Sequence, residues 1–220
     1  MTHKQRSSSK QRPSSDAVVA ISDEPHHHLI IDNDVLRAYA VEIGPGERTL
    51  CHQHLHHFLM YIAGSGQVRS TPQKGRASEH EYKDSDCEFF DEGLVHVVEN
   101  LGREPFRNLI VELLPGAGGV QRQGLPFASV AGVQAKHLYS GEKICAQLFE
   151  LRAGSQTQVT GPAVVAPSNG HALELITPEA GVRKLQYFRD LGYVEPGSTG
   201  LLRCEGDSPV AVLVVSVGVA

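Results

Sequence analysis

Residues 46–54 read GERTLCHQH and place His52 and His54 two positions apart, in a stretch without helical periodicity. Side chains at positions i and i+2 of a β-strand point to the same face. If this stretch forms a strand, both imidazoles lie on one side of it and can bind the same metal ion. The spacing therefore predicts a strand that carries part of a metal site.

A third histidine, His96, lies in a later stretch that reads DEGLVHVVEN (residues 91–100). Turn residues there are followed by a β-rich run. A closed barrel brings strands that are distant in sequence side by side. We therefore expect His96 to complete the site begun by His52 and His54.

Short apolar runs broken by Gly, Pro, Asn and Asp continue along the whole chain, and no helices are predicted between them. This pattern is typical of an all-β sandwich or barrel. We expect strands at residues 35–43, 58–62, 67–70, 87–90, 95–98 and 108–114 in the first half, and at 143–151, 172–176, 183–188, 200–204 and 210–217 in the second.

The two halves also repeat each other weakly. Residues 41–49 (VEIGPGERT) resemble residues 149–157 (FELRAGSQT), and residues 105–111 (PFRNLIV) resemble residues 209–215 (PVAVLVV). A repeat indicates one supersecondary unit used twice, which predicts two tandem barrels. The expected limits are a disordered tail at 1–25, a metal-binding domain at 26–115, a linker at 116–139 and a second domain at 140–220.

Composition narrows the possible partners. The net charge of −5 argues against binding to a nucleic-acid backbone. No apolar run reaches the roughly 18 residues of a membrane span, and no secretory signal opens the chain. The four cysteines include no CxxC pair, which suits reduced thiols. We expect a cytoplasmic protein with no nucleic-acid or membrane partner.

The two histidine stretches resemble the paired motifs of the cupin superfamily. This resemblance covers residues 28–115 well and residues 140–218 loosely. It implies a double-stranded β-helix, the cupin jelly-roll barrel, in each half, with a metal in the first barrel and a degenerate second cupin domain. The matching residues are Gly46, His52, His54 and Gly64 in the first motif and Gly93, His96 and Asn100 in the second.

The chain departs from the family pattern at one ligand. The family has a Glu after its paired histidines, but no Glu or Asp lies between His54 and Gly66. His57 lies nearest to that place, one residue short of the usual spacing. If His57 points inward, the expected ligands are His52, His54, His57 and His96. If it does not, three imidazoles remain, with His56 as a less favoured substitute.

The other histidines and the second half carry less chemistry. His26, His27 and His28 precede the first predicted barrel strand, and we expect solvent to surround them. Thr160 and Pro162 align with the paired histidines of the first half. We therefore expect the second barrel to be structural, packing against the first barrel or against its copy in a homodimer.

Imidazole ligands suit one divalent transition metal, among Fe, Zn, Ni, Mn and Cu. Three-histidine cupins often use Fe(II), so the resemblance implies a small-molecule dioxygenase with iron as the favoured metal. Two alternatives stay open: a metal-dependent isomerase or hydrolase if His57 is a fourth ligand, and a non-catalytic cupin that binds or senses a small ligand. The expected pocket wall is Leu59 or Met60, Tyr61 and Val98, and the nearest ionisable groups are Tyr61, Glu88 and Glu99.

Overall fold

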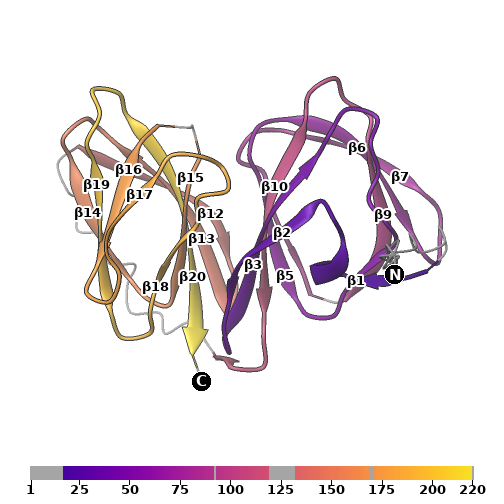
Figure 1. Cartoon of the computed structure of the whole chain (residues 1–220), viewed down its shortest axis with the longest axis horizontal. Helices are drawn as coiled ribbons and strands as arrows, with labels where there is room; N and C mark the ends of the chain where they lie inside the picture. Colours follow the sequence, from indigo (N-terminus) through magenta and orange to yellow (C-terminus); the bar gives the residue numbers. More distant parts are fainter. Residues whose placement is uncertain (1–16, 92, 119–131, 169–170, 220) are drawn as a thin grey trace, which may run out of the picture.

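The computed structural model describes residues 17–91, 93–118, 132–168 and 171–219, and their strands form two barrels that lie side by side (Figure 1). This confirms the predicted all-β class, with two tandem jelly-roll barrels. Most of the predicted N-terminal tail, and residues 119–131 of the predicted linker, lie outside the described residues. In the described part of the chain, no helix is long and apolar enough to span a membrane.

The first barrel consists of two five-stranded sheets. One sheet has the order β2 (His27–Asp32), β3 (Leu36–Ile43), β10 (Phe106–Leu113), β5 (Phe58–Ile62) and β8 (Cys87–Phe90). The other has the order β1 (Val19–Ala20), β4 (His52–His54), β9 (Leu94–Asn100), β6 (Gly66–Pro72) and β7 (Ser78–Tyr82). A 3-10 turn at Ile21–Asp23 joins β1 to β2.

The second barrel repeats this strand order. Its first sheet runs β12 (Val133–Ser140), β13 (Ile144–Leu151), β20 (Val210–Val219), β15 (Ala163–Pro167) and β18 (Gly192–Val194). Its second sheet runs β14 (Gln156–Thr160), β19 (Thr199–Cys204), β16 (Leu173–Thr177) and β17 (Gly181–Leu185). Strand β13 therefore corresponds to β3 and β20 to β10, which are the two places where the sequence repeats.

Strand pairing extends both barrels beyond the domain limits predicted from the sequence. Strand β1 pairs with β4, so the first barrel begins before residue 26. At the predicted linker, β11 (Ala117–Gly118) pairs with β20, and β12 pairs with β13. Both ends of the segment 116–139 therefore belong to the sheet of the second barrel.

The two barrels share a buried core between their first sheets. Leu59 and Leu109 of the first barrel belong to one apolar cluster with Ile144, Val164 and Leu213 of the second. Across this boundary Tyr61 Oη lies 2.6 Å from Ser168 Oγ. The second barrel therefore packs against the first, as one of the two sequence alternatives predicted.

Strand alternation divides the side chains of β5 between two environments. Leu59 and Tyr61 point into the core between the barrels, while Phe58 and Met60 line a cavity inside the first barrel. The interior of the second barrel is instead filled by apolar side chains such as Phe149 and Leu173. The cavity inside the first barrel is therefore the candidate position of a metal site.

Candidate metal centre

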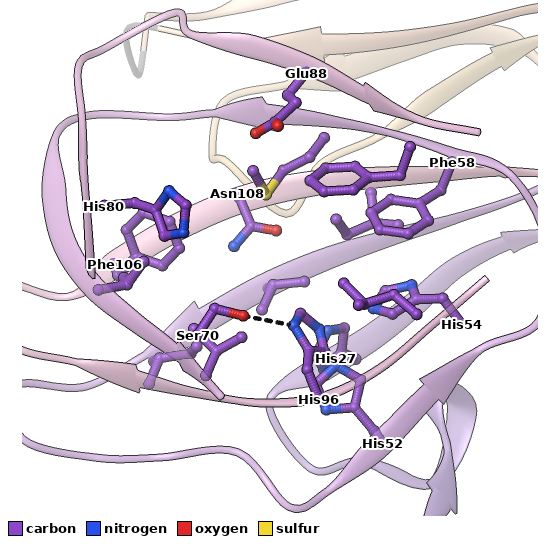
Figure 2. Close-up of a pocket in the computed structure, with 18 of the residues that line it drawn as sticks. His27, His52, His54, Phe58, Ser70, His80, Glu88, His96, Phe106 and Asn108 are labelled. Carbon is purple, nitrogen blue, oxygen red and sulfur yellow. Dashed lines mark hydrogen bonds between the residues drawn. The ribbon is translucent and has the colours of Figure 1, made fainter. Parts of the chain in front are cut away.

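Two paired strands bring three of the predicted ligands together. His52 and His54 lie on β4, and the register of the antiparallel pair β4–β9 sets His52 opposite His96. Their ring centroids are 5.2 Å apart for His52 and His54, 4.7 Å for His52 and His96, and 5.5 Å for His54 and His96. All three rings are buried and face one cavity of the first barrel (Figure 2).

A fourth imidazole comes from His27, which we had expected to be solvated. Its ring lies 4.6 Å from that of His52 and 6.0 Å from that of His54, and the residue is 8% exposed. One nitrogen from each of these three residues lies within 4.8 Å of the other two. The expectation was wrong because β2 already begins at His27, where pairing with Val41 turns the side chain inward.

The structure does not bring His57 into this group. Its side chain is 46% exposed, and its Nδ1 atom lies 3.2 Å from Asp91 Oδ1. The inward position at the start of β5 belongs to Phe58, whose ring stacks on His54 at 4.1 Å. His56 is also absent from the residues that line the cavity. An aromatic ring therefore fills the position where the family pattern expects a carboxylate.

Three of the four imidazoles are oriented by a hydrogen bond at Nδ1. His27 pairs with a carboxylate oxygen of Glu24 at 2.6 Å, His52 with the carbonyl oxygen of Leu50 at 2.9 Å, and His96 with Ser70 Oγ at 3.1 Å. With the proton on Nδ1, each of these rings keeps its Nε2 lone pair for a metal. His54 Nδ1 lies 3.5 Å from Glu112 Oε1, and these two buried atoms have no hydrogen-bond partner among the described residues.

The donor set fits a transition metal on two further observations. His52 Nε2 is fully buried and has no hydrogen-bond partner among the described residues. Such an orphaned group is costly unless a ligand satisfies it. Burial also lowers the pKa of His52 and His54 to about 3 and that of His96 to about 2. These imidazoles are therefore neutral near pH 7, the form that binds metals.

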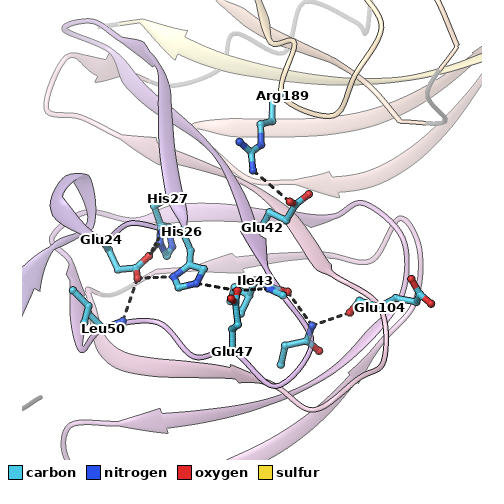
Figure 3. Close-up of polar contacts among 11 residues, drawn as sticks. Glu24, His26, His27, Glu42, Ile43, Glu47, Leu50, Glu104 and Arg189 are labelled. Atoms are coloured by element: carbon cyan, nitrogen blue, oxygen red, sulfur yellow. Dashed lines mark hydrogen bonds and ion pairs between the residues drawn. The ribbon is translucent and has the colours of Figure 1, made fainter.

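A buried carboxylate supplies negative charge behind the ligands. Burial by itself would raise the pKa of Glu24, but hydrogen bonds from His27 and His26 lower it to about 2. The backbone N–H of Leu50 also donates to this carboxylate, at 3.1 Å (Figure 3). Glu24 is thus an anion one hydrogen bond from His27, and it would compensate part of the charge of a metal bound beside that ring.

The cavity in front of the histidines has a volume of about 100 Å³. Met60 and Val98 line it as predicted, whereas Leu59 and Tyr61 do not. Of the three predicted ionisable groups, Glu88 lines the cavity, while Glu99 pairs with Arg69 at 3.1 Å outside it. The other polar lining residues are Ser70, which contacts His96, and His80, Tyr82 and Asn108.

Comparisons with known proteins identify the fold. No protein-family model and no curated protein matches the chain. Among solved structures it is similar to a cupin 2 conserved barrel domain protein from Leptotrichia buccalis (9% identity, 89% of each chain, TM-score 0.56). It is also similar to a salicylate 1,2-dioxygenase from Pseudaminobacter salicylatoxidans (13% identity, 86% of this chain and 75% of the other, TM-score 0.60). A third similar structure is the formate complex of oxalate decarboxylase from Lactobacillus farciminis (14% identity, 92% and 86%, TM-score 0.61). The chain therefore has the cupin fold.

Proposed function

We propose that the first barrel binds one divalent transition metal through His27, His52, His54 and His96, and that the protein is a small-molecule oxygenase of the Fe(II) cupin kind. The observation that carries this proposal is the buried, partnerless Nε2 atom of His52 at the centre of the imidazole cluster. A bound metal would supply a coordination point for substrate oxygen atoms and the redox chemistry of dioxygen.

The chain's own residues prepare the site in three ways. The carboxylate of Glu24 and the carbonyl of Leu50 hold two of the imidazoles in fixed orientations. Apolar side chains such as Phe58 and Met60 keep water away from the ligands. The cavity of about 100 Å³ is small beside the roughly 300–1,000 Å³ of drug-sized pockets, which selects a small substrate.

Several features favour oxygen chemistry over acid–base chemistry at the metal. The buried carboxylate nearest to the ligands, Glu24, is already engaged by His26, His27 and Leu50, so it is not free to accept a substrate proton. The imidazole ligands suit Fe(II), and one of the similar structures is a salicylate 1,2-dioxygenase. We also propose that the protein is a bicupin, in which the second barrel is structural and packs against the metal-binding first barrel.

One observation favours a second candidate, a metal-dependent isomerase or hydrolase. His27 adds a fourth imidazole to the rings of His52, His54 and His96, and four ligands would leave fewer coordination positions for substrate and dioxygen together. In that case Glu88, which lines the cavity beside Tyr82, is the group best placed to move a proton. Turnover without oxygen uptake would identify this candidate.

The test begins with metal content. We expect about one transition-metal ion per chain in the wild type, and loss of the metal in His52→Ala and His96→Ala. His57→Ala is the matched control, because that side chain lies outside the cavity, and it should retain the metal. Oxygen uptake is then measured with small diketone, phenolic and thiol substrates. A purified protein that holds no transition metal, even after reconstitution, would contradict the proposal.

Metal binding without turnover of any substrate would support the non-catalytic alternative, a cupin that binds or senses a small ligand. The homodimer and the cytoplasmic location stay predictions, to be checked by sedimentation analysis and by localisation of the tagged full chain.

A further inference from the structure

Asn108 is a polar side chain with no partner in a largely apolar cavity. The residue is 5% exposed, and its amide makes no hydrogen bond with any described residue. Its neighbours on the same face of β10, Phe106 and Ile110, line the same cavity. The amide opens onto the cavity, so it can both donate and accept hydrogen bonds with a molecule that enters there.

The position of this amide points to a ligand. Strand β10 lies between β3 and β5 and pairs with both at Asn108, so its backbone is firmly held. Figure 2 shows the Asn108 amide in the middle of the cavity, between the histidine cluster and Glu88. A molecule that reaches from the histidines toward Glu88 therefore passes within reach of this amide.

The charges of the lining restrict what such a molecule carries at its far end. The cavity is lined by one carboxylate, that of Glu88, and by no lysine or arginine among the described residues. A second anionic group on the ligand would thus meet a carboxylate and, apart from the imidazole of His80, no described side chain that can carry a positive charge. A hydroxyl group can exchange hydrogen bonds with an amide, which both donates and accepts.

We infer that Asn108 is a specificity-determining residue, and that the substrate is a small oxygen chelator with a neutral hydroxyl-type group at the end remote from the metal, and not a dicarboxylate. This inference rests on the proposed metal centre. The expected ligand has a metal-binding group at one end, a short apolar middle and, at the other end, one group that forms a hydrogen bond with the Asn108 amide.

Three 2-oxo acids that differ at one end provide the test. 2-Oxopentanoate ends in a methyl group, 4-hydroxy-2-oxobutanoate in a hydroxyl group at the same place, and 2-oxopentanedioate in a carboxylate. Their binding to Co²⁺-loaded full-length protein is measured by calorimetry and by the visible Co²⁺ spectrum. We expect the hydroxyl probe to bind about tenfold more tightly than the methyl probe, the effect of one hydrogen bond, and the dicarboxylate to bind most weakly.

Two variants assign the effect to Asn108. Asn108→Leu should bind Co²⁺ normally and lose the preference for the hydroxyl probe. Asn108→Asp keeps an acceptor and should retain that preference. Arg107→Lys, an exchange at the exposed neighbouring position of the same strand, is the control and should behave as wild type.

The outcomes separate this inference from the proposed function. Failure to load Co²⁺ would count against the metal centre itself. Normal loading with an unchanged preference in Asn108→Leu, tightest binding of the dicarboxylate, or no binding of any probe would each overturn the role of Asn108.

Discussion

Replacing Glu24 by Gln tests whether this carboxylate holds a metal ligand in place. Glu24 Oε2 accepts hydrogen bonds from His27 Nδ1 at 2.6 Å and from the backbone N–H of His26 at 2.9 Å. Its Oε1 accepts from His26 Nδ1 at 2.9 Å and from the backbone N–H of Leu50 at 3.1 Å. A glutamine side chain has one oxygen and one NH₂ group. Whichever way it turns, its NH₂ group therefore meets two donors.

The expected loss of stability follows from the pKa of Glu24. Hydrogen bonding lowers this pKa from 4.5 to about 2 in the folded protein. Such a shift corresponds to about 3 kcal/mol of stability, present above pH 4.5 and lost as the pH falls through about 2. Glu24→Gln should thus lower the free energy of unfolding of the metal-free protein by about 1.5–3 kcal/mol. Because His27 also loses its orienting partner, metal affinity should fall about 10–100-fold.

Urea unfolding of the metal-free protein and competition of Zn²⁺ with a chelator measure these two effects. Glu47→Gln is the matched control, because Glu47 also contacts His26, at 3.5 Å, but is 61% exposed in its side chain. That variant should change stability by no more than about 0.5 kcal/mol. If Glu24→Gln binds Zn²⁺ with wild-type affinity, His27 is not a ligand positioned by this carboxylate.

Three other properties can be measured directly. The free energy of unfolding of the metal-free protein should fall as the pH drops from 6.5 toward about 3, by up to about 1.4 kcal/mol per pH unit for each of His52, His54 and His96. The reason is that these imidazoles bind protons in the unfolded chain but not when they are buried in the folded one. Urea titrations that give the same free energy across this pH range would refute this. Tyr61→Phe removes the hydrogen bond across the barrel interface and should cost about 1 kcal/mol by the same assay, with unchanged metal affinity. Burial raises the pKa of Cys87 to about 12, so iodoacetamide at pH 8 should alkylate this thiol slowly in the native protein and rapidly in urea; equal rates in both states would contradict the burial.

Much of the site was predictable from local pattern. The alternation of side chains along a strand placed His52 and His54 on one face, and turn residues before His96 indicated a second strand. The structure brings these three residues together through the register of β4 with β9. Two short pieces of sequence were sufficient here because both lie in strands whose own pattern shows which side faces inward.

The fourth imidazole was not predictable in the same way. His26, His27 and His28 are adjacent, so alternation alone does not say which one faces inward. That choice depends on where β2 begins and on its pairing with β3, which sets His27 opposite Val41. The signal available in the sequence was Glu24, three residues before His27, but its meaning depends on the turn at Ile21–Asp23 that folds the carboxylate back.

The sequence by itself therefore predicts a repeated all-β fold with two histidines on one strand, because hydrophobic alternation and turn residues are patterns of a few neighbouring positions. Tertiary structure decides which imidazoles form the cluster. Phe58 rather than His57 faces the cavity because β5 begins at residue 58, and a shift of one residue in a strand turns every side chain to the other face. That register is set by pairing with β10 and β8, whose residues lie far away along the chain.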